Sequence, residues 1–365
     1  MKRLRGAIVG FGNVITEAHL PGFAEAKGFD VVAVADAAAE ARAAVKTHLP
    51  EARVYETLTA LLEGEGKLEF VDIATPPRFH AEAAVEALRR GIHVLCEKPL
   101  AVSRSEMNDV RTAASRAHRS VFTVHNWKYA PLFRRLHGVI VAGTIGEPSA
   151  IEWTVLRPNP PGGSPAAESW RLDRQAAGGG ILTDHGWHAF YLMLYLTRQT
   201  PQSVSAVTRH DRGLEVEDNA DCTIGFPSCT ARIHLSWTAP ERRSFGEIRG
   251  PLGTITIDDS SLTVSVEDRE PQVTRFAPPL SANSYHPEWF SPLLEDFRSE
   301  VLHADQRGRN LSEAVWCADL LQAAYDSRGE VVRFESPEAE AEPAAGPAAE
   351  DLTSSEPPRE PDTEG

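Results

Sequence analysis

The sequence predicts an α/β protein in which a doubly wound parallel sheet is followed by an α+β domain with a large, mostly antiparallel open sheet. Three observations lead to this prediction. Short apolar strands alternate with helical stretches up to about residue 125, longer strands follow one another from Pro148, and the apolar residues thin out after Glu335. We therefore expect a first domain over residues 1–125, a second over 126–335, and a disordered acidic tail over 336–365.

Strands and helices are expected to alternate in the first domain, because apolar runs of strand length are separated by stretches with the apolar spacing of a helix. Ser103 and Glu106 add a capping box at the start of one helix. The expected strands are 4–9, 30–35, 70–74, 92–95 and 120–124. The expected helices are a stretch that ends at Ala26, then 39–48, 57–62, 80–90 and 103–118. Strands separated in this way pair in parallel, so their carboxyl ends and the turns that follow share one edge.

A glycine turn follows the first strand directly. Gly10 permits a tight turn and Gly12 a close backbone approach, which is the context of a dinucleotide fingerprint, although Ile15 stands where the third glycine is expected. Asp36 ends the second strand, and its distance in sequence from Gly12 is near that expected for an acid that binds the ribose 2′-hydroxyl. Three alanines follow Asp36, so no adjacent cation is available for a 2′-phosphate. This pattern favours NAD over NADP, while Arg42 on the next helix leaves NADP open.

The second domain begins with a helix over 132–142, and its strands then come in sequence with turn residues between them. This succession is typical of an antiparallel sheet. The expected strands are 150–156, 203–208, 220–226, 230–237, 244–249, 254–257, 262–266 and 272–276. Helices are expected over 181–196, 288–302 and 312–325, and 331–334 is expected to return as a strand to the first sheet.

Composition narrows the possible partners and the compartment. The net charge of -15 argues against nucleic acid and anionic membranes as partners, and from Pro337 onward nine acids stand against Arg359 alone. No window approaches the length of a membrane span. The four cysteines have neither metal-site spacing nor a disulfide framework, so we expect reduced thiols in a cytoplasmic protein.

Two stretches carry residues suited to chemistry. Lys98 follows the strand 92–95, and Pro99 ends that strand, so the lysine lies at the edge where α/β sheets bind ligands. In the glycine-rich stretch 178–188, Asp184 and His188 are four positions apart and share a helix face. A carboxylate beside an imidazole suits proton transfer to or from a hydroxyl, and a surface ion pair is the alternative. We expect no metal at Asp184, His185 and His188, because no further ligand motif lies nearby.

Taken together, these stretches resemble the Gfo/Idh/MocA oxidoreductases, the group of glucose-fructose oxidoreductase and inositol dehydrogenase. The resemblance extends from about Leu4 to Phe334. It rests on Gly10-Phe-Gly12, Thr75-Pro-Pro77 with His80, Glu97-Lys98-Pro99, Trp170-Arg171, and Gly178-Gly-Gly180 through Asp184 to His188. It implies a Rossmann domain followed by an α+β domain whose sheet forms a homodimer or homotetramer. It also implies hydride transfer between NAD(P) and a secondary alcohol of a sugar or cyclitol.

The resemblance also implies roles for individual residues. Lys98 would contact both the nicotinamide ribose and the substrate hydroxyl, His188 would be the general acid/base, and Asp184 would orient it or hold a substrate hydroxyl. The residues expected to bind the cofactor are Gly10, Phe11, Gly12, Asn13, Val14, Asp36, Thr75, Pro76, His80, Glu97 and Lys98. Those expected at the substrate are Lys98, Tyr129, Trp170, Arg171, Asp184, His185 and His188.

The sequence departs from the family pattern where an Arg-aromatic pair is replaced by Lys128-Tyr129, which bears on the substrate rather than on the chemistry. Aromatic candidates for stacking on a sugar are Trp127, Tyr129, Trp153 and Trp170, and the turn-rich segment 157–165 is expected to border the substrate cleft. Two other functions stay open for the same fold. One is a redox-neutral glycosidase that uses NAD⁺ transiently, and the other is a non-catalytic regulator that binds nucleotide and a protein partner.

Overall fold

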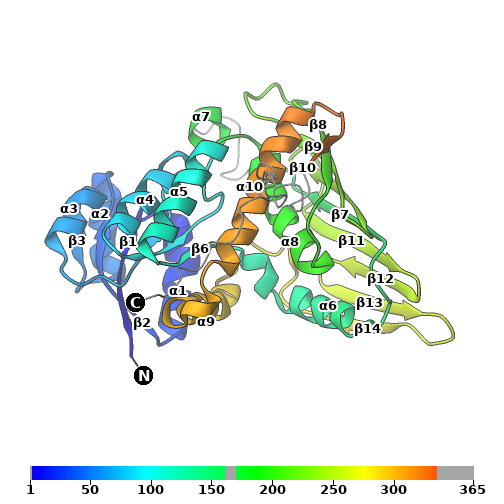
Figure 1. Cartoon of the computed structure of the whole chain (residues 1–365), viewed down its shortest axis with the longest axis horizontal. Helices are drawn as coiled ribbons and strands as arrows, with labels where there is room; N and C mark the ends of the chain where they lie inside the picture. Colours follow the sequence, from blue (N-terminus) through cyan, green and yellow to red (C-terminus); the bar gives the residue numbers. More distant parts are fainter. Residues whose placement is uncertain (1, 161–169, 335–365) are drawn as a thin grey trace, which may run out of the picture. The chain divides into compact units, whose positions relative to one another are not determined.

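The computed structural model describes residues 2–160 and 170–334. Its first sheet is parallel, and its six strands lie in the order β3-β2-β1-β4-β5-β6 (Figure 1). The strands are β1 (Leu4–Val9), β2 (Phe29–Ala35), β3 (Arg53–Tyr55), β4 (Phe70–Ile73), β5 (His93–Cys96) and β6 (Val121–Thr123). This order confirms the predicted doubly wound sheet. Because β1 pairs with both β2 and β4, the chain reverses its winding direction beside β1, where ligands of such sheets bind.

Helices cover both faces of this sheet. They are a π-helical turn (Ile15–His19) leading into α1 (Leu20–Glu25), α2 (Ala39–His48), α3 (Leu58–Gly64), α4 (His80–Arg89) and α5 (Arg104–Ala117). The capping box at α5 is present, since Ser103 Oγ accepts from Glu106 N–H. The Glu106 carboxylate reaches back to the N–H of Val102 instead of that of Ser103.

A helix from the second half of the chain completes one face of the first sheet. Phe290 and Phe297 of α9 (Pro287–Leu302) belong to an apolar cluster with Phe29 and Phe70, which lie on β2 and β4. The ring centroids of Phe297 lie 6.1 Å from Phe29 and 5.8 Å from Phe70. The parallel sheet is therefore packed by residues from both sides of the boundary expected at residue 125.

The second sheet has nine strands in the order β14-β13-β12-β11-β7-β10-β9-β8-β15, and every neighbouring pair is antiparallel except β7 and β10. The strands are β7 (Ala150–Leu156), β8 (Ser203–Arg209), β9 (Asn219–Gly225), β10 (Thr230–Ser236), β11 (Arg243–Gly250), β12 (Gly253–Asp258), β13 (Ser261–Val266), β14 (Gln272–Arg275) and β15 (Val332–Arg333). The predicted open, mostly antiparallel sheet is confirmed. The return of 331–334 to the first sheet is wrong, because Val332 pairs with Val204 of β8.

The remaining helices are α6 (Pro131–Val141), α7 (Arg174–Ala177), α8 (Trp187–Thr197) and α10 (Arg309–Ser327). α8 is buried along most of its length, and its Phe190, Tyr191 and Leu192 are fully inaccessible to solvent. A π-helical turn over Leu182–Gly186 precedes α8, so the expected continuous helix from Ile181 is interrupted at its start. None of the helices in the described part of the chain has the length and apolarity needed to cross a membrane.

Candidate functional site

A groove of about 570 Å³ lies at the carboxyl ends of β1, β2 and β4. Gly10 has φ +88°, and a Cβ there would stand 2.8 Å from the backbone nitrogen of Thr75, so only glycine fits. A Cβ at Gly12 would meet no atom within 4 Å, which leaves the backbone of the turn open to the groove. The hydroxyl of Thr75 is buried there without a hydrogen-bond partner among the described residues. An accessible glycine turn and an unpaired hydroxyl fit a dinucleotide in this groove.

The end of β2 shapes the outer part of the groove. Asp36 Oδ2 accepts from Phe11 N–H at 2.6 Å, and Oδ1 accepts from Ala38 N–H at 2.7 Å, so the carboxylate fixes the glycine turn. Arg42 is held by the carbonyl oxygens of Asp36 and Ala37, at 2.9 and 2.7 Å. Glu56 adds a second carboxylate to the lining. If a dinucleotide places its ribose here, the carboxylates of Asp36 and Glu56 would repel the 2′-phosphate of NADP.

Lys98 lies at the inner end of the groove, where a second cavity of about 90 Å³ begins. Its Nζ contacts Asp184 Oδ1 at 2.5 Å and donates to the Asp184 carbonyl at 3.0 Å. The other carboxylate oxygen, Oδ2, is 3.1 Å from His185 Nδ1. Burial alone would raise the pKa of the Asp184 carboxyl, but Lys98 and His185 outweigh burial and hold that pKa well below its usual value.

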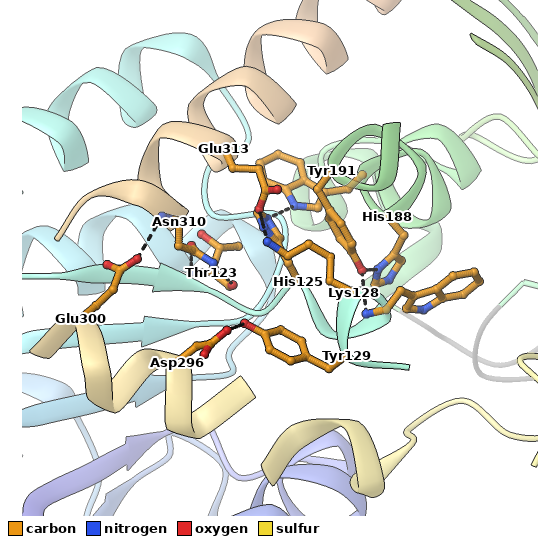
Figure 2. A network of polar contacts seen from close by, with 12 residues as sticks. Thr123, His125, Lys128, Tyr129, His188, Tyr191, Asp296, Glu300, Asn310 and Glu313 are labelled. Atoms are coloured by element: carbon orange, nitrogen blue, oxygen red, sulfur yellow. Dashed lines mark hydrogen bonds and ion pairs between the residues drawn. The ribbon is translucent and has the colours of Figure 1, made fainter. Parts of the chain in front are cut away.

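His188 is oriented by a tyrosine. Its Nδ1 is 2.7 Å from the hydroxyl of Tyr191 (Figure 2). That hydroxyl accepts from Trp127 N–H at 3.1 Å, and the His188 ring stacks on the Trp127 ring. The expected pairing of Asp184 with His188 is therefore replaced by two separate pairs, and no hydrogen bond joins these two residues in the described structure. Burial, and then the charge of Lys98, hold the pKa of His188 well below its usual value. Two tautomers of the neutral imidazole satisfy this bond, and the one whose Nδ1–H donates to Tyr191 presents Nε2 as a proton acceptor.

The glycine-rich stretch before Asp184 is clamped by a buried acid. Glu217 Oε1 accepts from Gly180 N–H at 2.9 Å, from Leu182 N–H at 3.1 Å and from the Tyr325 hydroxyl at 2.7 Å. A Cβ at Gly180 would stand 2.0 Å from the Glu217 carbonyl oxygen. Glycine is thus required by close packing, and the clamp fixes the turn that carries Asp184.

Glu97 belongs to a buried triad. His19, at the end of the first π-helical turn, is fully buried; its Nδ1 is 2.7 Å from Asp72 Oδ2 and its Nε2 is 3.0 Å from Glu97 Oε1. The other Glu97 oxygen accepts from Lys98 N–H at 3.1 Å. Burial disfavours the imidazolium, but the adjacent carboxylates of Asp72 and Glu97 prevail and raise the pKa of His19 to about 9. A charged His19 therefore connects the glycine-turn helix to the backbone of Lys98.

The other predicted residues are placed as follows. Val14, Thr75, His80, Glu97, Trp170 and Arg171 line the cavity with Lys98 and Asp184, and Phe11, Asn13 and Pro76 line the outer groove. Trp170 is 37 % exposed, and the Arg171 guanidinium lies 4.3 Å from its ring centroid. Of the segment 157–165, residues 161–165 lie outside the described residues.

Tyr129 is not brought to the Lys98 cavity. Its hydroxyl donates to Asp296 at 2.8 Å, in a separate cavity of about 350 Å³ (Figure 2). Lys128 lines the same cavity and pairs with Glu313 at 2.6 Å. Trp127 and Trp153 are buried in the core. The expected substrate role of Tyr129 therefore finds no support in its position.

Sequence reasoning missed several residues that hold the site. They are His19, Asp72, Tyr191, Glu217 and Tyr325. Asp72 left a signal, because a carboxylate in the apolar strand Phe70–Ile73 requires a partner. The partners of Glu217 and Tyr325 lie 35 or more residues away in the chain, so spacing alone does not reveal them.

Comparison with known proteins identifies the family. Residues 4–125 match a family model described as an oxidoreductase family with an NAD-binding Rossmann fold, and residues 133–256 match the GFO/IDH/MocA C-terminal domain. The chain is 29 % identical to 1,5-anhydro-D-fructose reductase of Ensifer adhaerens over 69 % of this chain and 74 % of that protein. It is 25 % identical to D-apiose dehydrogenase of Paraburkholderia graminis over 93 % and 92 % of the two chains. A solved structure of levoglucosan dehydrogenase with NADH shares the fold, with a TM-score of 0.81 at 20 % identity over 91 % and 99 %.

The His19 triad predicts a specific dependence of stability on pH. Because the pKa of His19 is raised to about 9 in the folded state, its contribution is complete below about pH 6.5 and is lost as pH rises through 9. The free-energy difference between wild type and His19→Asn should shrink by on the order of 3 kcal/mol between pH 6.5 and 9.5. Urea unfolding at several pH values measures it, with the exposed His118→Asn as control. A difference that stays constant across this range would contradict a charged His19.

Proposed function

Because the chain belongs to the Gfo/Idh/MocA family of oxidoreductases, we propose that it transfers a hydride between NAD and a secondary alcohol of a sugar or cyclitol. The observation that carries this proposal is the pairing of Lys98 with Asp184 in the cavity at the inner end of the glycine-turn groove, near enough to His188 for both charges to act on its pKa. The named relatives are sugar reductases and dehydrogenases, which supports the same substrate class. We propose residues 1–125 as the cofactor domain and residues 126–335 as the domain for substrate and oligomerisation.

Alcohol oxidation needs a proton acceptor and a stabilised alkoxide, and the residues supply both. His188 Nε2 takes the hydroxyl proton while Nδ1–H stays bound to Tyr191, so the ring does not rotate as its charge changes. The Lys98 ammonium stabilises negative charge that develops on the substrate oxygen. Asp184 keeps that ammonium in place, since it holds Nζ by both a carboxylate and a carbonyl oxygen. The nicotinamide, when bound, accepts the hydride from the alcohol carbon.

We propose that NAD is preferred to NADP. The Asp36 and Glu56 carboxylates line the groove, while Arg42 is already bonded to backbone carbonyls. We also infer a cytoplasmic location, in keeping with four cysteines that are all buried and unpaired, and cell fractionation would test it.

The cofactor preference predicts the outcome of a nucleotide titration followed by fluorescence. NADH should bind at micromolar affinity and at least about tenfold more tightly than NADPH. Asp36→Asn should reduce this preference because the repulsion of the 2′-phosphate is removed. Asp30→Asn removes the same charge from an exposed position at the other end of β2 and should change nothing. Tighter binding of NADPH would reverse the preference, and binding of neither nucleotide would sink the dehydrogenase proposal.

The catalytic proposal predicts NAD⁺ reduction at 340 nm with a sugar and cyclitol panel. His188→Gln should lower kcat/KM by at least about 100-fold while NADH binds as before, because only the proton acceptor is lost. In the wild type, kcat/KM should rise with pH and level off below pH 6.5, since the pKa of His188 lies below its usual value. A flat absorbance trace accompanied by sugar release would favour the redox-neutral glycosidase instead. Nucleotide binding without any turnover would favour the regulator.

We further propose that two or four copies associate through the uncovered face of the nine-stranded sheet. That face carries half-exposed charged side chains, such as Glu152 and Glu247 around Arg249. Light scattering should give at least twice the chain mass of 39.9 kDa, and Glu152→Lys should shift the population toward monomer. A monomer at micromolar concentration would refute the association.

A further inference from the structure

Two strands of the second sheet end side by side next to the catalytic residues. β7 and β10 are parallel neighbours, and Arg157 N–H donates to the Ser236 carbonyl at 2.8 Å just beyond their last pair. Side chains alternate along a strand, and Trp153 and Val155 of β7 are buried. Arg157 continues this inner face of β7, and Trp237 continues the corresponding face of β10.

Arg157 is a buried cation without a direct counter-ion. It is only 2 % exposed, and its Nη atoms bond to neutral oxygens: the carbonyls of Leu156 and Arg243, at 2.7 and 3.1 Å, and the Ser244 hydroxyl at 3.2 Å. Among residues 2–160 and 170–334, its Nε–H has no hydrogen-bond partner and its guanidinium joins no ion pair. Burial and the neighbouring Arg242 lower the pKa of Arg157 to about 10, so the guanidinium stays charged at neutral pH. A buried charge of this kind is costly unless a ligand completes its surroundings.

Trp237 provides a second unpaired donor at the same place. It is 1 % exposed, and its Nε1–H is buried without a partner among the described residues. Trp237 lines the cavity that holds Lys98 and Asp184, and its ring lies 6.4 Å from that of His185. Arg157 lies close enough to this cavity for the Asp184 carboxylate to raise its pKa and for its own charge to lower that of His185. Trp237 therefore places one unpaired donor on the cavity wall, and Arg157 is its neighbour on the same face of the sheet.

Lys98 is balanced by Asp184. Arg157 has no such partner among the described residues, because Asp259, the carboxylate that acts on it most, bonds instead to Ser244 N–H and to Ser281. A neutral sugar would leave the buried guanidinium unpaired, whereas a carboxylate would supply a negative charge and two acceptor oxygens for Arg157 Nε–H and Trp237 Nε1–H.

We propose that the substrate is a sugar acid whose carboxylate is bound by Arg157 Nε–H and Trp237 Nε1–H. This inference rests on the proposed hydride transfer and names the class of its substrate. The carboxylate is unchanged in the reaction. The secondary alcohol carbon gives a hydride to NAD⁺, the hydroxyl proton passes to His188, and the products are a keto acid and NADH.

The test compares acids with neutral molecules of nearly the same shape. The full chain with saturating NAD⁺ is assayed by NAD⁺ reduction at 340 nm. The acid–neutral pairs are hexuronates with their methyl esters and aldonates with the corresponding alditols. Hexose 6-phosphates are tested as a third class of substrate. At least one free acid should exceed its neutral counterpart by about 100-fold in kcat/KM, because the neutral counterpart leaves a buried guanidinium unpaired. Equal use of acid and neutral compound, or a preference for the phosphates, would overturn the proposal.

Variants locate the effect. Arg157→Met should remove about 100-fold of kcat/KM for the acid, mainly through KM, while the rate with the neutral counterpart and the affinity for NADH stay within about threefold. Arg157→Lys should retain part of the preference. Arg111→Met is the matched control, because Arg111 is exposed on α5, away from both the cavity and the proposed sheet interface. An undiminished acid preference in Arg157→Met would overturn the assignment.

The outcomes separate this inference from the proposed function. Binding of NADH with turnover of neutral sugars alone would refute the carboxylate but keep the dehydrogenase. Binding of NADH with turnover of neither acids nor neutral compounds would refute the carboxylate and favour the regulator. Failure to bind NADH at all would refute the dehydrogenase itself. If Arg157→Met does not fold, as judged by thermal unfolding, the wild-type comparison and Arg157→Lys decide the question.

Discussion

The contact between Lys98 Nζ and Asp184 Oδ1, at 2.5 Å, is the interaction on which the site depends. It joins the turn after β5 in the parallel sheet to the π-helical turn before α8, so neither half of the chain holds the site alone. Each partner is fixed by its own support. The His19–Glu97 bond holds the backbone of Lys98, and the Glu217 clamp holds the turn that carries Asp184. Because the ammonium is already held by its counter-ion, it needs little reorganisation when a substrate oxygen gains charge.

Local signals were sufficient for most of the fold. The alternation of apolar strands and helices predicted the parallel sheet, and the capping box at Ser103 marked the start of α5 within one residue. The strand β3 was not expected, because Arg53–Tyr55 is three residues long and has no fully buried side chain. The short strand Val332–Arg333 was assigned to the wrong sheet. A two-residue strand has no pattern that chooses its partner, and its pairing with β8 depends on the helix α10 that delivers it.

The site was predicted where backbone requirements appear in the sequence, and missed where partners meet only in the fold. A Cβ at Gly10 or Gly180 would clash with neighbouring backbone atoms, so only glycine fits at these positions. The two glycines therefore indicated both turns in the sequence. The spacing of Asp184 and His188 indicated a shared helix face, but the π-helical turn over Leu182–Gly186 adds a residue to that turn and changes their relative direction. Asp184 therefore faces Lys98, and His188 takes Tyr191 as its partner. The prediction from helical spacing was wrong here because it assumed an α-helix, and the chain forms a π-helical turn.

The division of charge in the cavity gives each side chain a separate task. Burial and the charge of Lys98 keep His188 neutral and ready to accept a proton, while the same charge keeps Asp184 ionised. Lys98 would repel a second free cation, yet Arg157 remains buried near enough for its charge to lower the pKa of His185. The guanidinium of Arg157 is desolvated, and no ion pair in the described structure compensates for this. An apolar residue at the end of β7 would destabilise the fold less. Binding of a substrate carboxylate to Arg157 and Trp237 would offset this desolvation free energy. It would do so at the place where the alcohol of the substrate must be oriented.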